Sequence, residues 1–266
     1  MSWTSGGASI VGSSHRKTDT PCQDAHLIVT ANGSLIVAVS DGLGSAALSH
    51  IGAKHVCTSV IHSIERTFDM QRTRKLSLGG VRELIWRFTR APKNPEQMLK
   101  EAFAEAHTSL SKLATAEGNL LSAYACTLVV VVVMPDSWHT LHIGDGAVVG
   151  VDEDGSVRTL SAPERGEFVN SVTPLTSTRY QRAYRYAEGH ERLHGVAVFS
   201  DGIQNLCINY KTGAAFDGFF QPILSWFRGL PRDYDRTTAI AKLLDSAQIR
   251  QKSDDDLTLA IALRSS

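Results

Sequence analysis

The stretch Leu35-Ile36-Val37-Ala38-Val39-Ser40-Asp41-Gly42-Leu43-Gly44 changes its character in the middle. Its first six residues are almost all apolar, which predicts a buried strand. The Asp-Gly pair predicts a turn directly after that strand. Beyond the turn, apolar side chains recur at helical spacing, which predicts a helix over about Ser45–Phe68; they are Ala53, Val56, Val60, Ile64 and Phe68. The first recognisable unit is therefore a strand that ends at an aspartate and leads into a helix.

A hairpin comes before this unit. Ala25–Thr30 and the strand at 35–40 flank the sequence Ala31-Asn32-Gly33-Ser34. An Asn-Gly pair between two apolar runs is a strong signal for a two-residue hairpin turn. A short apolar segment, Ala8–Gly12, predicts one further strand near the N-terminus.

The rest of the chain contains more helices and strands. A long helix is expected at Pro95–Ala116, because apolar residues again recur at helical spacing. Residues 69–97 are basic and irregular, and we interpret them as a variable insertion with one short helix near Val81–Phe88. Residues 161–180 are polar and turn-rich, which predicts a mobile flap. Further strands are expected at Cys126–Met134, Thr140–Gly144, Ala147–Asp152, Val157–Leu160, Gln181–Tyr186, Gly195–Ser200 and Leu257–Leu263, and further helices at Phe216–Phe227 and Arg236–Arg250.

The order of these elements predicts an α+β fold. Helices fall between blocks of strands and do not alternate with them one by one, which argues against a Rossmann-type parallel sheet. Two sheets packed face to face with helices outside suit this order. No Pro/Gly/Ser-rich linker interrupts the 266 residues, so residues 1–266 are expected to form a single domain.

Composition excludes several classes of partner. Lysine plus arginine and aspartate plus glutamate both number 27, so no net charge attracts nucleic acid or an anionic membrane surface. The longest apolar run, Leu128–Met134, is far shorter than the ~20 residues that cross a bilayer. It predicts a buried central strand instead.

Cysteine usage and the N-terminus favour the cytoplasm. Cys22, Cys57, Cys126 and Cys207 show no CxxC spacing, so we expect four reduced thiols and no zinc ribbon. The first residues contain no basic segment followed by an apolar one, so no signal peptide is expected.

Four aspartates share one setting, at the end of an apolar strand: Asp24, Asp41, Asp201 and Asp255. Strand ends of a sandwich meet at a common rim, where clustered carboxylates repel one another unless cations neutralise them. Oxygen ligands favour Mg²⁺, Mn²⁺ or Ca²⁺ over zinc. The glycine after Asp41 would let a backbone carbonyl, that of Gly42, approach a metal as well.

The alternative is that an Asp-Gly pair is simply a turn after a strand. Asp145-Gly146 and Asp154-Gly155 fit that simpler interpretation. The repeated context of the four aspartates favours a metal site, but spacing alone leaves both interpretations open.

Six short motifs, in order, resemble those of the metal-dependent protein phosphatase family (PPM, type 2C) over nearly the full length. In this chain, the first motif has His15 ahead of Cys22-Gln23-Asp24, and this form is similar to a bacterial subgroup of that family. The motifs are Gly12-Ser13-Ser14-His15-Arg16 through Cys22-Gln23-Asp24-Ala25, Val39-Ser40-Asp41-Gly42-Leu43-Gly44, Ala125-Cys126-Thr127-Leu128, His142-Ile143-Gly144-Asp145-Gly146, Phe199-Ser200-Asp201-Gly202 and Asp255-Asp256-Leu257-Thr258.

This resemblance implies a β-sandwich flanked on both faces by pairs of helices. It also implies two Mn²⁺ or Mg²⁺ ions bridged by Asp41. One ion would take Asp41 and the Gly42 carbonyl, and the other would take Asp41, Asp201 and Asp255. Asp24 would act from behind, by holding a metal-bound water.

The implied activity is hydrolysis of phosphoserine and phosphothreonine in proteins. A water activated between the two metals would attack phosphorus in line with the leaving oxygen. The implied catalytic residues are Asp24, Asp41 and Arg16, with the Arg16 guanidinium binding the substrate phosphate. The expected partner is a phosphorylated protein, such as a Ser/Thr kinase or its target.

Three residues depart from the family pattern. Gln23 replaces a glutamate, and Leu43 stands where some members carry a histidine proposed as general acid. Asn205 replaces an aspartate that, with Asp145, can hold a third metal, so a third site is in doubt. His15 lies near the proposed site, and either a catalytic or phosphate-binding role or none is compatible with the sequence.

Three functions therefore compete. The first is an active protein phosphatase. The second is a catalytically weak relative that binds phosphoproteins or a kinase as a regulatory module. The three departures motivate it, but the retention of Asp41, Asp201 and Asp255 favours activity over a pure binding role. The third is a hydrolase of small phosphate esters. The chain contains neither a Gly-x-Ser-x-Gly elbow nor a GxxxxGK[ST] loop, so a serine hydrolase and a P-loop NTPase are disfavoured.

Overall fold

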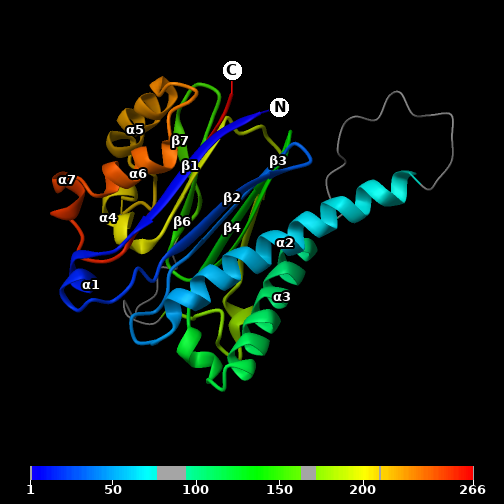
Figure 1. Ribbon diagram of the computed structural model, residues 1–266. Helices are drawn as coiled ribbons and strands as arrows, with labels where there is room; N and C mark the ends of the chain where they lie inside the picture. The colour runs from blue at the N-terminus through cyan, green and yellow to red at the C-terminus, as the bar shows by residue number, and fades with distance from the viewer. Residues whose placement is uncertain (1, 77–93, 163–171, 210, 266) are drawn as a thin grey trace.

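Two five-stranded antiparallel sheets form the centre of the structure, and helices cover their outer faces (Figure 1). The computed structural model describes residues 2–76, 94–162, 172–209 and 211–265. The layers are helix, sheet, sheet and helix, which confirms the predicted α+β sandwich. Within the described ranges, no helix combines the length and the apolar character needed to span a membrane.

The first sheet has the strand order β2-β3-β4-β5-β8. Its β2–β3 turn has positive φ at both Asn32 (52°) and Gly33 (79°), as a two-residue hairpin of this type requires. The predicted hairpin is therefore confirmed. The five strands are β2 (Ala25–Ala31), β3 (Ser34–Ser40), β4 (Leu128–Val133), β5 (Trp138–Ile143) and β8 (Arg185–Gly189).

The second sheet has the strand order β1-β10-β9-β6-β7. It joins the two ends of the chain, because β1 pairs with β10 along the whole length of both strands. Its strands are β1 (Trp3–Ile10), β6 (Ala147–Val151), β7 (Val157–Ser161), β9 (Gly195–Phe199) and β10 (Leu257–Arg264).

The helices fall into two groups, one outside each sheet (Figure 1). Two long helices, α2 (Ser49–Leu76) and α3 (Pro95–Ala116), cover the first sheet. The second sheet is covered by α4 (Gln204–Cys207), α5 (Asp217–Gly229), α6 (Arg236–Leu244) and α7 (Ala247–Arg250). A short helix, α1 (Ser13–Lys17), follows β1, and single 3₁₀ turns lie at Leu121–Tyr124, Tyr180–Ala183 and Asp201–Ile203.

The hydrophobic core has three layers. One lies between the α2–α3 pair and the first sheet, and another between the second sheet and α4–α7. The middle layer lies between the sheets, where Val129, Val131 and Val133 of β4 meet Val196 and Val198 of β9. The valine run is therefore buried on both faces of its sheet, as a central strand should be.

Several predicted boundaries are wrong. The N-terminal strand begins at Trp3, not Ala8, because a strand that contains Gly6-Gly7 carries little sequence signal. Helix α2 continues to Leu76, into the stretch interpreted as an irregular insertion, since no glycine or proline interrupts residues 69–76. The short helix predicted near Val81–Phe88 lies outside the described residues.

Three further predictions need correction. The strand predicted at Gln181–Tyr186 is a 3₁₀ turn followed by β8. The helix predicted at Arg236–Arg250 breaks after Leu244 into α6 and α7. Residues 163–171 of the predicted flap lie outside the described residues, but its later part packs firmly: Leu175 is fully buried and donates its N–H to the Cys126 carbonyl at 2.8 Å.

Candidate active site

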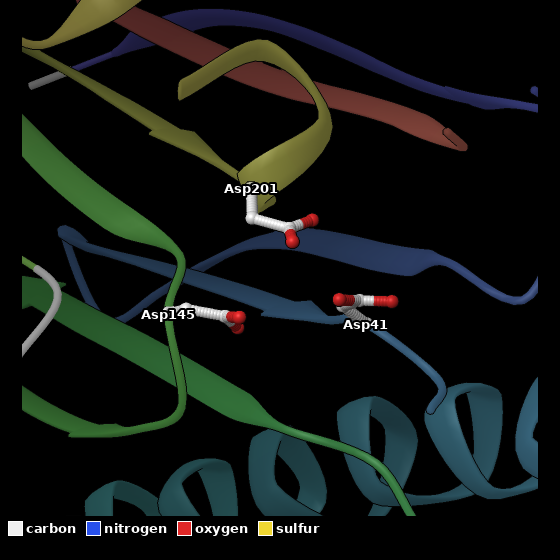
Figure 2. Close-up of side chains that lie close together, drawn as sticks. All are labelled: Asp41, Asp145 and Asp201. Carbon is white, nitrogen blue, oxygen red and sulfur yellow. The ribbon is translucent and has the colours of Figure 1, made fainter. Parts of the chain in front are cut away.

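Three carboxylates from different strand ends meet in one cluster (Figure 2). Asp41 follows β3, Asp201 follows β9, and Asp145 lies in the turn from β5 to β6. Each offers an oxygen that lies within 4.8 Å of an oxygen from the other two. Because β3 and β9 belong to different sheets, the packing of the two sheets brings these acids together.

Asp41 is held by a threonine at the start of the neighbouring strand. The Asp41 N–H donates to Thr127 Oγ1 at 2.9 Å, and the Thr127 N–H donates to the Asp41 carbonyl at 2.7 Å. Ser40 Oγ donates to the Thr127 carbonyl at 2.6 Å. Gly42 follows in a crowded place, where a Cβ would lie 2.8 Å from the Gln23 carbonyl oxygen. The backbone around Asp41 is therefore fixed independently of any ligand.

Asp24 lies behind the cluster and is buried. Ser200 Oγ donates to Asp24 Oδ2 at 2.7 Å, and the same hydroxyl accepts the Thr258 N–H at 3.1 Å. Burial, the largest influence, raises the pKa of the Asp24 carboxyl to about 6. Asp24 is thus a buried acid that interacts with Asp41, and its implied role of holding a metal-bound water stays a prediction.

The cluster is electrostatically unfavourable without a cation. Burial raises the pKa of Asp41 well above its usual range, and the charges of Asp24, Asp201 and Asp145 raise it further. Burial raises the pKa of Asp201 to about 8, with added effects from Asp145 and Asp255. The pKa of Asp145 is raised for the same reasons. Carboxylate oxygens so arranged are suitable ligands for hard divalent cations.

An open cleft of about 380 Å³ gives access to the cluster. Most of the predicted metal ligands line this cleft, namely Asp41, Gly42, Asp201 and Asp255, whereas Asp24 does not. Asp145 lines it too, although the sequence suggested a simple turn there. The signal for Asp145 was present, because it follows an apolar strand and precedes glycine, as Asp41 and Asp201 do. The individual roles of these residues as ligands stay predictions.

Arg16 lies elsewhere. Its Nη2 donates to Asp245 Oδ1 at 2.8 Å, and both side chains are about half exposed. Arg16 is not among the residues that line the cleft. Its predicted contact with the substrate phosphate stays a prediction, and it would require the ion pair with Asp245 to open.

Asp256, next to the predicted ligand Asp255, is a buried acid that sequence reasoning passed over. Its two oxygens accept the backbone N–H groups of Gly12 and Gln23, each at 2.6 Å. His15 Nδ1 lies 3.0 Å from Asp256 Oδ1. Asp256 therefore ties the start of α1 and the segment before Asp24 to the start of β10.

His142 and the cysteines have no place in the cluster of acids. His142 of β5 is fully buried, and its Nδ1 shares a hydrogen bond of 2.9 Å with Ser161 Oγ. Burial lowers the pKa of this imidazole well below its usual range, so it is a neutral core residue. All four cysteines are free thiols.

Comparisons with known proteins agree with this geometry. Residues 11–245 match the family described as Protein phosphatase 2C. Serine/threonine-protein phosphatase 3 of Escherichia coli (strain K12) is 29% identical over 270 residues, covering 99% of both chains.

Solved structures share the fold at lower sequence identity. PppA, a key regulatory component of T6SS in Pseudomonas aeruginosa, is 16% identical, with a TM-score of 0.62 and coverage of 99% of this chain and 98% of PppA. The catalytic domain of the serine threonine protein phosphatase PstP, in complex with two manganese ions, is 14% identical, with a TM-score of 0.61 and coverage of 98% and 97%. Because the family match spans most of its length, the chain belongs to the protein phosphatase 2C family and is by class a protein serine/threonine phosphatase.

Proposed function

We propose that this chain hydrolyses phosphoserine and phosphothreonine esters in proteins, with two divalent cations, Mn²⁺ or Mg²⁺, held in the cleft. The observation that carries the proposal is the cluster of Asp41, Asp145 and Asp201, whose oxygens lie within 4.8 Å of one another beside an open cleft. The PstP structure, which holds two manganese ions on the same fold, supports it.

The residues present fit such cations. The donor set consists of carboxylates and a backbone carbonyl, which are the ligands that Mg²⁺ and Mn²⁺ prefer. Asp41, the Gly42 carbonyl, Asp201 and Asp255 are the groups that would hold these ions. Cations bound there would stabilise the charge on the phosphoryl oxygens and make a water molecule more acidic.

The protein itself contributes position and support. Thr127 fixes Asp41, and Ser200 fixes Asp24, so the acids are held before substrate arrives. Asp24 is buried and interacts with Asp41, so it is suited to help orient a water molecule bound beside Asp41 in the cleft. The geometry gives little support for a third ion. Asp145 lines the cleft, but Asn205 is exposed on α4 and does not line it.

The cleft suits a phosphorylated side chain that projects from a protein. It is open to solvent and lined mostly by polar groups, so a phosphate on a flexible loop can reach the cluster. The partner would be a phosphorylated protein, such as a Ser/Thr kinase or a kinase target.

A substrate panel tests the proposal. The purified chain, supplied with Mn²⁺, is assayed for phosphate release from phosphothreonine, phosphoserine and phosphotyrosine peptides and from glycerol phosphate. We expect turnover of the first two peptides and a preference for them over glycerol phosphate. Faster hydrolysis of glycerol phosphate would indicate a small-ester hydrolase, and peptide binding without turnover would indicate a regulatory module. An Asp201→Asn variant, assayed in parallel, controls for contaminating phosphatases.

A further inference from the structure

The turn that carries Asp145 packs closely against the residue that supports Asp41. Asp145 lies in the turn Gly144-Asp145-Gly146, between β5 and β6. Gly144 has a φ of 107°, a conformation that favours glycine. A Cβ at Gly144 would lie 2.5 Å from the side chain of Thr127, whose hydroxyl accepts the Asp41 N–H. Thr127 therefore supports both Asp41 and the turn that carries Asp145.

Arg185 holds this turn from another strand. It is the first residue of β8 and pairs with His142 of β5, so both side chains lie on the same face of the first sheet. That face looks toward the second sheet, because His142 Nδ1 shares a hydrogen bond with Ser161 of β7. From this face, Arg185 Nη2 donates to the Gly144 carbonyl. The guanidinium therefore reaches the turn from the space between the sheets.

The hydrogen bond from Arg185 fixes the peptide group at which Asp145 begins. The Gly144 carbonyl and the Asp145 N–H belong to one planar peptide unit, so holding the oxygen restricts the rotation of that unit. The carboxylate itself has little support, because Asp145 Oδ1 is buried and has no hydrogen-bond partner among the described residues. Its side chain points from the turn toward Asp41 and Asp201 (Figure 2). The backbone of the turn therefore sets the direction of this carboxylate.

The positive charge of Arg185 also acts on the cluster. Burial is the largest influence on the pKa of Asp145 and raises it, whereas the charge of Arg185 lowers it. The guanidinium is therefore close enough to interact with this carboxylate. The same charge would repel a cation bound beside Asp145. Charge alone thus predicts that Arg185 weakens cation binding, whereas support of the turn predicts that Arg185 strengthens it.

Resting on the proposed function, we propose that Arg185 is a positioning residue, which keeps the Asp145 carboxylate in the cluster by holding the Gly144 carbonyl. Arg185 is not among the residues that line the cleft, so its effect runs through Asp145. Groups that orient a metal ligand are typically worth about 10- to 100-fold in metal affinity. Solvent in the open cleft weakens the repulsion between Arg185 and a cation, so position outweighs charge.

The test is a double-mutant cycle on Mn²⁺ affinity. Arg185→Met removes the donor and the charge but keeps an unbranched side chain. Calorimetric titration of the metal-free protein with Mn²⁺ gives the Kd of the unchanged chain, of Arg185→Met, of Asp145→Asn and of the double variant. We expect Arg185→Met to raise the Kd about tenfold or more. In the Asp145→Asn background, it should cause no further weakening, because no carboxylate is left to position. Arg185→Lys, which keeps the charge and an N–H donor, should bind Mn²⁺ more tightly than Arg185→Met.

A matched control and a second variant complete the design. Arg182→Met makes the same change at an exposed arginine just before β8 and should leave the Kd unchanged. Thermal unfolding of the metal-free variants checks their fold. If Arg185→Met does not fold, Arg185→Gln, whose side chain is too short for the Gly144 carbonyl, takes its place with the same expectation.

Two results would overturn the proposal. One is Mn²⁺ binding by Arg185→Met that is as tight as in the unchanged chain or tighter. The other is an equal weakening in the Asp145→Asn background, which would mean that Arg185 does not act through Asp145. If the unchanged chain binds no Mn²⁺, the proposed function fails and this role falls with it, a result distinct from both.

Discussion

Asp41 is the residue on which the chemistry of the cleft depends most. Its carboxylate belongs to the cluster of three, and its backbone is fixed by Thr127. Asp41→Asn keeps the size of the side chain but removes the charge. Cations contribute several kcal/mol of charge stabilisation, so we expect kcat/KM with Mn²⁺ to fall by at least about 100-fold.

The fold of this variant should survive, because the change relieves repulsion among buried acids. Thermal unfolding of the metal-free chain checks that point, and the Tm should not fall. Asp233→Asn, at an exposed position, is the matched control. Near-normal turnover by Asp41→Asn would show that the active site lies elsewhere.

The pKa of Asp201, raised to about 8, predicts a pH dependence of stability in the metal-free chain. Because the folded chain holds this proton more tightly than the unfolded chain, the stabilisation is complete below the unfolded pKa. It is lost as pH rises through the folded pKa. Buried histidines act in the opposite direction, but only up to about pH 6.5. The informative window is therefore about pH 6.5 to about pH 8.

In this window, the free energy of unfolding of the EDTA-treated chain should fall as pH rises. Asp201→Asn should show a smaller fall, because its side chain does not titrate. Urea unfolding at several pH values measures both chains. Identical pH profiles would mean that Asp201 is ionised throughout the window.

For single residues, the sequence predicts which aspartates lie at the ends of apolar strands, because the Asp-Gly pair recurs there. The sequence predicts less well which other residues lie beside these aspartates. Asp145 has the same context, but the sequence there was equally compatible with a simple turn. Asp256 directly follows the predicted ligand Asp255, and the sequence alone does not show that these two adjacent acids have different roles. The ion pair of Arg16 with Asp245 joins residues far apart in sequence, and no local pattern indicates it.

Among the elements, the junction between β9 and β10 is closely packed at Gly202. A Cβ on Gly202 would lie 1.9 Å from the Asp256 carbonyl oxygen, which is backbone and has little freedom to move. Gly202→Ala should therefore destabilise the chain by about 2 kcal/mol or more. It should also lower activity, because Asp201 and Asp256 lie on either side of the clash.

Gly229→Ala, at the end of α5, is the matched control. Apart from its chain neighbours and the backbone of its own helix, no atom lies within 4 Å of the position of its Cβ, so the change should be neutral or stabilise by up to about 1 kcal/mol. Urea unfolding of both variants measures the difference. Equal stability of the two variants would show that the β9–β10 junction adapts more readily than its packing indicates.

Long periodic helices and buried strands are the elements that the sequence predicts best. Pro95–Ala116 is found with the predicted bounds, because it has an N-cap at Asn94, a proline at its first position and a clear apolar face. Elements with mixed signals are predicted poorly. The polar end of α2 lacks an apolar stripe, β1 contains two glycines, and only Asp245 and Ser246 separate α6 from α7.

For the whole molecule, the order of strand and helix blocks is enough to predict a layered sandwich, but not which strands become neighbours. The site depends on that missing information, because β3 and β9 belong to different sheets and bring Asp41 and Asp201 together only when the sheets pack. Folding and cation binding should therefore be linked. A cation that binds only the folded chain raises its stability with concentration.

The central claim is that cations held by this cluster are needed for phosphate release. The most direct measurement is phosphate release from a phosphothreonine peptide by the purified chain, before and after exhaustive treatment with EDTA and after the return of Mn²⁺ or Mg²⁺. The account predicts that EDTA abolishes turnover and that either ion restores it. Full turnover by the thoroughly chelated chain would contradict it.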